Sequence, residues 1–112
     1  MTASDLAQKI KTILDDKKAK DIDVIDVSDK TILADYFVIA TGTSTTHVKA
    51  LADEVEYLLK EKDQRLVDHV EGFESSRWIL LDYGDVVVHV FHSEERDFYS
   101  LEKLWQQSRS RT

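Results

Sequence analysis

The sequence contains no cysteine and no proline, and only three of its 112 residues are glycine. The lack of cysteine excludes disulfides, thiolate metal ligands and cysteine nucleophiles, and it fits a protein kept in a reducing cytoplasm. No low-complexity stretch marks a linker, and no internal repeat is present. Because a chain of this length has room for one hydrophobic core, we expect a single domain over residues 1–112.

Long apolar runs are also missing, since none approaches the roughly 18 residues that a membrane-spanning helix needs. Residues 1–5 offer neither the basic flank nor the apolar stretch of a signal peptide. We therefore expect a cytoplasmic protein with no membrane partner.

Basic residues are in deficit: 15 Lys and Arg stand against 22 Asp and Glu, which gives a formal net charge of −7. This field repels phosphate backbones, so direct binding of nucleic acid is disfavoured as the main activity, and we expect a basic protein partner and no DNA partner. The exception is a small basic cluster, Lys17, Lys18 and Lys20, which can touch RNA at close range. The simpler interpretation is a solvated helix end whose lysines complement the helix dipole.

Apolar residues recur at helical spacing in three segments. The first helix is expected to begin at a Ser4 cap and to end near residue 17 or 18, and the second to span about residues 45–62. A third helix is expected from Ser93, where early acidic residues suit the positive helix end. Its buried face consists of Phe98, Leu101, Leu104 and Trp105, and residues 106–112 are expected to form a flexible tail.

Strands are expected between these helices, in the order α-β-β-α-β-β-β-α. Residues 21–28 alternate between apolar and acidic, and residues 36–40 form an apolar run typical of a central strand. A short strand is expected at 65–70, followed by a hairpin that pairs 78–83 with 86–91 around a Gly-Asp turn. A strand-helix-strand unit over residues 36–70 implies a right-handed parallel crossover. The predicted fold is mixed α/β (α+β), with a five-stranded mixed sheet flanked by helices.

The segment 41–46, Thr-Gly-Thr-Ser-Thr-Thr, resembles a phosphate-binding loop because hydroxyls at a helix N-terminus present donors to an anion. It lacks the second glycine and the lysine of a P-loop, and it does not match G-x-G-x-x-G. A strand-to-helix turn needs a glycine and a hydroxyl cap in any case.

Four histidines raise the question of a metal site. His89 and His92 are three residues apart in a strand, so their side chains are expected to leave opposite faces. His47 and His69 lie on other elements, and no H-E-x-x-H motif is present. We predict no metal and no cofactor, and His47, just inside a helix, is the best candidate for a functional polar contact.

Paired acids, Asp82 with Asp85 and Asp23 with Asp26, are candidates for acid/base chemistry. Catalysis by such a pair needs a pocket that raises one pKa, which a tight hairpin does not offer, and Asp is common at turns. We therefore expect no catalytic residues and no enzyme.

Trp78 has two interpretations. On a strand it shares a face with Leu80 and Asp82, whereas Ile79, Leu81 and Tyr83 share the other face. Burial of the indole in the core is one interpretation. In the other, Trp78, Leu80, Asp82 and the turn form an exposed anchor of the kind found in binding hot spots.

Several blocks, taken together in their order and spacing, point to one family. They are 35–44 (DYFVIATGTS) with His47 and Val48, 70–72 (VEG), Trp78, 82–91 (DYGDVVVHVF), and Arg96-x-x-Tyr99-x-Leu101-Glu102-x-Leu104-Trp105. On these blocks the chain resembles the ribosomal silencing factors, also called Iojap-like proteins, from the first helix to Trp105.

The resemblance implies a regulator without catalytic activity. Members of this family bind the large ribosomal subunit through universal large-subunit protein fourteen, a basic protein, and block association with the small subunit when nutrients are short. It also implies a fold similar to nucleotidyltransferases, although the Gly-Ser and Asp-x-Asp metal-binding pattern is absent here. Homodimers are a further property of the family.

On this basis the partner-binding hypothesis names six residues, not all of which alternation can place on one face. Trp78 and Leu80 supply apolar contact, Tyr83 and Gly84 allow close backbone approach, and Asp82 and Asp85 pair with basic side chains. Two other functions stay open: a nucleotide-handling enzyme, and a dimeric adaptor with a non-ribosomal target.

Overall fold

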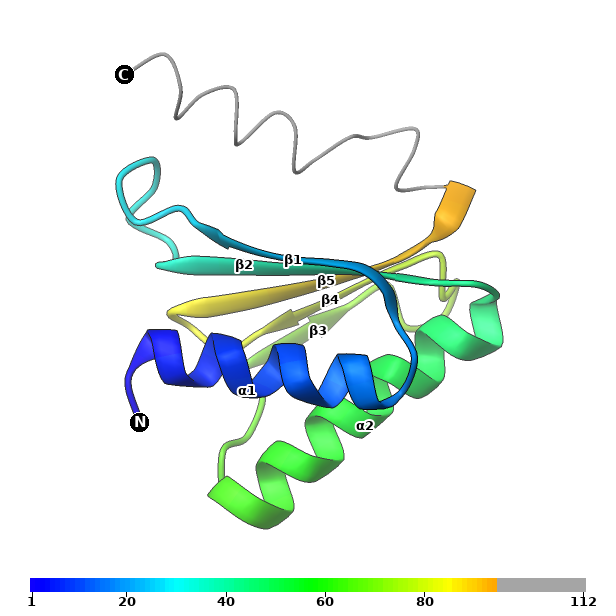
Figure 1. Cartoon of the computed structure of the whole chain (residues 1–112), viewed down its shortest axis with the longest axis horizontal. Helices are drawn as coiled ribbons and strands as arrows, with labels where there is room; N and C mark the ends of the chain where they lie inside the picture. Colours follow the sequence, from blue (N-terminus) through cyan, green and yellow to red (C-terminus); the bar gives the residue numbers. More distant parts are fainter. Residues whose placement is uncertain (95–112) are drawn as a thin grey trace.

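The computed structural model describes residues 1–94, in which two helices and five strands follow the predicted order (Figure 1). The predicted third helix from Ser93 and the predicted tail at 106–112 lie almost entirely outside the described residues. No helix in residues 1–94 is long and apolar enough to cross a membrane. The elements are α1 (Ala3–Asp16), β1 (Lys20–Asp26), β2 (Tyr36–Gly42), α2 (Thr45–Asp63), β3 (His69–Glu71), β4 (Trp78–Asp82) and β5 (Val86–His92).

The five strands form one mixed sheet in the order β1-β2-β5-β4-β3, which confirms the predicted fold class. β2 is parallel to β5, while the pairs β1–β2, β4–β5 and β3–β4 are antiparallel. β3 therefore runs in the same direction as β2, as a crossover requires, but β5 and β4 lie between them. The long central strands are apolar because both of their faces are covered.

The start of α1 corrects one prediction: the cap is Thr2, and Ser4 lies inside the first turn. The Thr2 hydroxyl accepts from the backbone N–H of Asp5 at 3.1 Å, and the Asp5 carboxylate accepts from the Thr2 N–H at 3.2 Å. This reciprocal capping box satisfies two free donors, which a Ser4 cap could not do with the same acid. The two Thr2 hydrogen bonds, first the backbone one and then the hydroxyl one, lower the pKa of Asp5.

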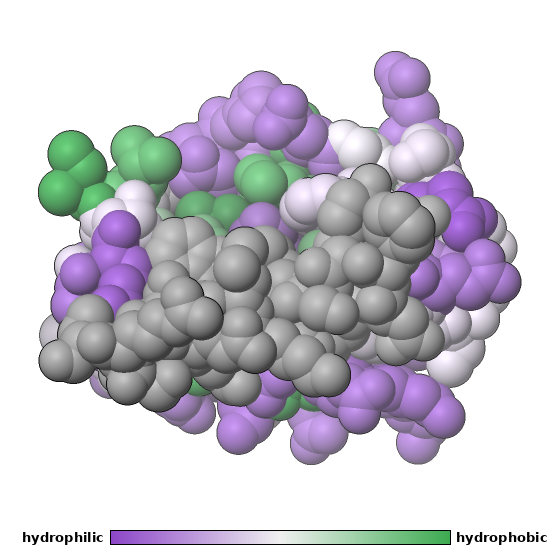
Figure 2. Space-filling model, turned by 90° about the horizontal axis from the view of Figure 1, so that it is seen from above, coloured by the Kyte–Doolittle hydropathy of each residue, from purple (hydrophilic) through white to green (hydrophobic). Residues whose placement is uncertain are grey.

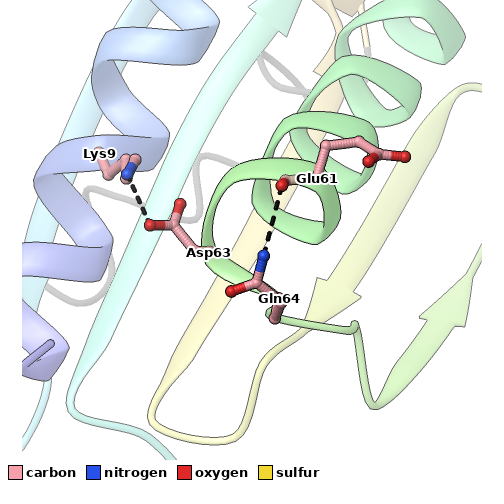
Figure 3. A network of polar contacts seen from close by, with 4 residues as sticks. All are labelled: Lys9, Glu61, Asp63 and Gln64. Carbon is pink, nitrogen blue, oxygen red and sulfur yellow. Dashed lines mark hydrogen bonds and ion pairs between the residues drawn. The ribbon is translucent and has the colours of Figure 1, made fainter.

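The end of α2 is fixed by a polar network at its last turn (Figure 3). Lys9 of α1 donates to Asp63 at 2.8 Å, so an ion pair joins the two helices. Gln64 then takes a left-handed backbone conformation with φ 51°, and its side chain donates to the carbonyl of Glu61 at 3.5 Å.

The left-handed turn explains why β3 is shorter than predicted, beginning at His69 instead of residue 65. The backbone N–H of Arg65 still bonds to Leu59, a carbonyl of the helix, at 3.0 Å. The first sheet-like bond comes only at Asp68, which donates to the carbonyl of Asp82 at 2.8 Å. Residues 65–68 are thus the return from the helix to the sheet edge.

Two hydrophobic clusters lie on opposite faces of the sheet. The larger joins α1 and α2 to one face, and both helices cover this face in Figure 1. The smaller is on the other face and contains Ile25, Val27, Ala34, Ile39 and Phe91. Ile25 of β1 is buried in the second cluster, while Ile22 and Val24 pack against the first, so both faces of this strand are covered.

Candidate protein-interaction face

The face of the sheet that points away from α1 and α2 carries a set of aromatic and apolar side chains. The strand pairings put Leu80 of β4 beside His89 of β5, and His89 beside Ile39 of β2. Because side chains alternate along each strand, the neighbours two positions away share this face. We call it the aromatic face, and its residues are Phe37, Ile39, Trp78, Leu80, Asp82, Val87, His89 and Phe91.

His89 lies at the centre of the aromatic face. Its Nδ1 atom accepts a hydrogen bond from the indole N–H of Trp78 at 3.2 Å, so the proton of the neutral ring must sit on Nε2. The Phe37 ring meets the imidazole edge to face with 4.9 Å between centroids. The side chain is only 5% exposed, and burial lowers the pKa of His89 to about 4. His89 is therefore neutral at physiological pH.

Among the described residues, Phe91 and His89 both contact the Trp78 side chain on this face. Its ring stacks on Phe91 with 4.7 Å between centroids, and its N–H is bonded to His89. The side chain is half-buried, so it is neither fully in the core nor fully exposed, the two interpretations that the sequence allowed. Ile79 and Leu81 are fully buried on the helix side, which confirms the predicted division of this strand into two faces. The hydrogen bond and the ring contact together fix the orientation of the indole in the structure.

A pocket of about 310 Å³ opens beside His89 on the aromatic face. Apolar side chains form its walls, among them Phe37 and Leu80, and His89 contributes to its lining. Two carboxylates, Glu71 of β3 and Asp82 of β4, also line it. The remaining lining residues are Leu33, Ala34, His69 and Val87.

The loop between β1 and β2 adds exposed apolar surface at the rim of this pocket. Ile32 and Leu33 are 102% and 82% exposed, unusual values for large aliphatic side chains. Figure 2 looks onto this side of the molecule and shows hydrophobic atoms protruding at one end of it. Adjacent exposed aliphatic residues next to a pocket are typical of a protein-binding surface.

The hairpin tip separates the remaining predicted site residues from the aromatic face. Tyr83 is fully buried in the cluster under the helices, and burial raises the pKa of its hydroxyl above the ordinary value. Gly84 is exposed at φ +88°, and its N–H donates to the Asp82 carboxylate at 2.8 Å. Asp85 lies 3.5 Å from the Arg65 guanidinium, which also donates to the Tyr83 carbonyl. Of the six residues, the structure brings only Trp78, Leu80 and Asp82 together.

Both ring nitrogens of His47 are engaged by backbone groups of this chain. Its Nδ1 atom accepts from the backbone N–H of Thr43 at 3.0 Å, and its Nε2 atom pairs with the carbonyl of Lys17 at 3.1 Å. The ring therefore ties the start of α2 to the end of α1. Within residues 1–94 no group of three potential ligands is arranged to hold a metal ion.

The loop that resembles a phosphate cradle is built for close packing. A Cβ atom on Gly42 would come within 2.7 Å of the Val48 side chain and 2.9 Å of its backbone nitrogen. The Ser44 hydroxyl caps α2 by accepting from the N–H of His47 at 3.0 Å. Glycine and hydroxyls at these positions are thus explained by the turn itself.

Sequence reasoning missed His89, Glu71 and the exposed pair Ile32 and Leu33 as parts of one surface. A signal for His89 was present: a lone histidine between Val87 and Phe91, in step with them on one side of an apolar strand. No signal joined Glu71 to Asp82, because their proximity depends on how β3 pairs with β4.

Comparison with known proteins links the whole chain to one protein family. The family model described as "Ribosomal silencing factor during starvation" matches residues 1–112. A protein of Halalkalibacterium halodurans named a ribosomal silencing factor is 41% identical over 105 residues, covering 94% of this chain and 89% of that protein. A Mus musculus protein named "Mitochondrial assembly of ribosomal large subunit protein 1" is 38% identical, covering 84% of this chain and 42% of that protein. A crystal structure from Chromobacterium violaceum superimposes with a TM-score of 0.90 at 42% identity, covering 95% of this chain and 88% of that one.

Proposed function

Because this chain belongs to the ribosomal silencing factor family, we propose that it binds the large ribosomal subunit and blocks its association with the small subunit. The direct partner is universal large-subunit protein fourteen, a basic protein, and the result is repression of translation under nutrient limitation. The observation that carries the proposal is the aromatic face, where a fixed indole and an aliphatic side chain lie next to carboxylates. A relative named for the large ribosomal subunit supports the choice of subunit.

The six predicted partner-binding residues take different parts in this proposal. Trp78 and Leu80 are half-buried apolar contacts, and Asp82 supplies charge beside them. The Tyr83 side chain is buried in the core and anchors the end of β4, so it makes no direct contact with the partner. Gly84 and Asp85 sit at the exposed tip, where a partner backbone can approach and where Asp85 shares its charge with Arg65.

The proposed inhibition is steric and makes or breaks no covalent bond. A folded domain that occupies the surface where the small subunit must dock prevents docking by its volume alone. The membership of the chain in a family named for silencing supports a regulator over an enzyme. A nucleotide-handling activity would predict a rise in melting temperature with nucleotide and Mg²⁺, and we expect none.

Three further properties belong to the proposal. The site of action is the cytoplasm, the free protein is a homodimer, and the basic cluster at the end of α1 makes a peripheral contact with ribosomal RNA. Lys18 and Lys20 are exposed, while Lys17 is 3.4 Å from Glu54. Analytical ultracentrifugation of the free protein tests the dimer.

The deciding experiment is co-sedimentation of the purified protein with isolated large and small subunits, followed by a subunit-joining assay. We expect binding to large subunits alone, and fewer joined particles when the protein is in excess. Trp78→Ala is expected to weaken binding about 30-fold, since anchor residues of this type typically contribute about 2 kcal/mol. Asp82→Lys is expected to weaken it as well, by placing a cation against a basic partner.

Matched controls come from the opposite side of the molecule. Tyr57 is a 60% exposed aromatic residue of α2, and Asp53 is an exposed acid of the same helix. Tyr57→Ala and Asp53→Lys should bind like the unmodified protein. If Trp78→Ala and Asp82→Lys are folded and sediment with large subunits as well as the controls do, the aromatic face is not the binding surface.

A further inference from the structure

We propose that Arg65 is a positioning residue for partner binding. It holds the hairpin tip between β4 and β5, residues 83–85, so that the Asp85 carboxylate is presented to a cation of the partner protein. The inference rests on the proposed function, in which Asp85 pairs with a basic side chain of that partner. Arg65 acts through Asp85 and makes no contact of its own with the partner.

The backbone of Arg65 is fixed by the end of α2. Gln64 has a left-handed conformation with φ 51°, and the N–H of Arg65 still donates to the Leu59 carbonyl at 3.0 Å. The chain turns out of the helix at this point, and residues 65–68 run back to the edge of the sheet. The Arg65 side chain therefore starts from a fixed point beside the hairpin tip.

The Arg65 guanidinium lies against the hairpin tip. Its Nη2 atom donates to the Tyr83 carbonyl and is 3.5 Å from Oδ1 of Asp85. A Cβ atom on Gly84 would come within 3.9 Å of the same nitrogen. The Nε atom of Arg65 is buried, so the inner part of the side chain is packed against the protein. One planar group thus joins the two residues on either side of Gly84.

The hairpin tip needs this contact because its backbone is held mainly from the other side. The N–H groups of Asp35 and Tyr36 donate to the Asp85 carbonyl at 2.8 and 3.1 Å. These bonds fix the Asp85 backbone but leave its side chain free to rotate. Gly84 is exposed at φ +88°, and glycine has the largest conformational freedom to lose. Within residues 1–94, the ion pair with Arg65 is what orients the Asp85 carboxylate.

The ion pair between Arg65 and Asp85 adds little to stability by itself. The two side chains are 42% and 46% exposed, and water screens such pairs. The larger effect is on binding, because a side chain that is already ordered loses less entropy when the partner arrives. A carboxylate has two acceptor oxygens, so Oδ1 beside Arg65 leaves Oδ2 for a second cation. Arg65 should therefore slow dissociation of the partner more than it stabilises the fold.

The test measures association and dissociation rates of purified universal large-subunit protein fourteen on the full chain by surface plasmon resonance. Arg65→Met keeps a long side chain and removes its charge and donors. Lys62→Met, at an exposed lysine of α2, changes the net charge equally and is the matched control. Both changes make the chain more acidic, so both should slightly raise the association rate with a basic partner. Only Arg65→Met should raise the dissociation rate, by about fivefold to tenfold.

The dependence on Asp85 is tested by a double-mutant cycle. Asp85→Asn alone should raise the dissociation rate about fivefold. In the Asp85→Asn background, Arg65→Met should raise it by less than about twofold, because the carboxylate that Arg65 positions is gone. Arg65→Lys keeps the charge but lacks the planar fork that reaches Tyr83 and Asp85 together, so it should dissociate at an intermediate rate. This variant carries the same cycle if Arg65→Met fails to fold.

The outcomes separate the two proposals. If the unmodified protein binds neither protein fourteen nor large subunits, the proposed function itself is wrong. If it binds, but Arg65→Met dissociates like Lys62→Met, Asp85→Asn binds unchanged, or the two effects multiply in the double variant, Arg65 does not position Asp85 and the proposed function stands. Faster dissociation that is confined to the Arg65 variants and disappears in the Asp85→Asn background supports the positioning role.

Discussion

Acidification should destabilise this protein through one buried side chain, His89. Burial lowers the pKa of His89 to about 4, while the pKa of a histidine in the unfolded chain is about 6.5. The unfolded chain therefore takes up the proton first as the pH falls, so the stabilising contribution is complete above about pH 6.5 and is lost progressively toward pH 4. The full effect is about 3 kcal/mol, and about 2 kcal/mol of it should be gone at pH 5.

The assay is urea unfolding at pH 7 and pH 5, followed by circular dichroism. Carboxylates also titrate in this range, so the informative quantity is the difference between the unmodified protein and His89→Gln, which cannot ionise. The unmodified protein should lose about 2 kcal/mol more free energy of unfolding between the two pH values than the variant does. His69→Gln, at a histidine whose side chain is 60% exposed, is the control and should behave like the unmodified protein. Equal losses in His89→Gln and in the unmodified protein would refute a neutral, buried imidazole.

Three further predictions concern stability and are each checked by urea unfolding at pH 7. Gly72→Ala should lower the free energy of unfolding by about 2 kcal/mol or more, because φ is +81° and the new Cβ would lie 1.9 Å from the Trp78 carbonyl oxygen; an unchanged midpoint would contradict this geometry. Ser44→Ala should lower it by about 1 kcal/mol through loss of the cap on the His47 N–H, and Ser44→Asp should restore it; equal stability of all three proteins would rule out the cap. Tyr83→Phe should leave stability unchanged or raise it, since the buried hydroxyl has no partner within residues 1–94; a loss above about 1 kcal/mol would reveal a hydrogen bond to it.

The elements could be read from the sequence because their signals are local. The apolar stripe of α2 and the alternation of β4 repeat over many residues, and both predictions were confirmed. The errors fell at element ends. The Thr2 cap and the late start of β3 depend on single hydrogen bonds, made to Asp5 and Asp82, which spacing alone does not select.

The candidate site was only half predictable, for the same reason. Alternation correctly grouped Trp78 with Leu80 and Asp82 and put Tyr83 on the other face, but it could not say which of the two faces lies under the helices. The position of β3 at the sheet edge decides that Glu71 joins Asp82. The roles of individual histidines also required the fold: His47 ties two helices together, and His89 holds the indole.

Composition and periodicity alone determined the acidic character and the mixed α/β fold class, because net charge and hydrophobic patterning are properties of the chain itself. The order of the strands is different, since it places residues far apart in the sequence on one surface. Only the tertiary structure therefore decided which side chains form the aromatic face, and which imidazole is buried there with a proton that lacks an acceptor in the described chain.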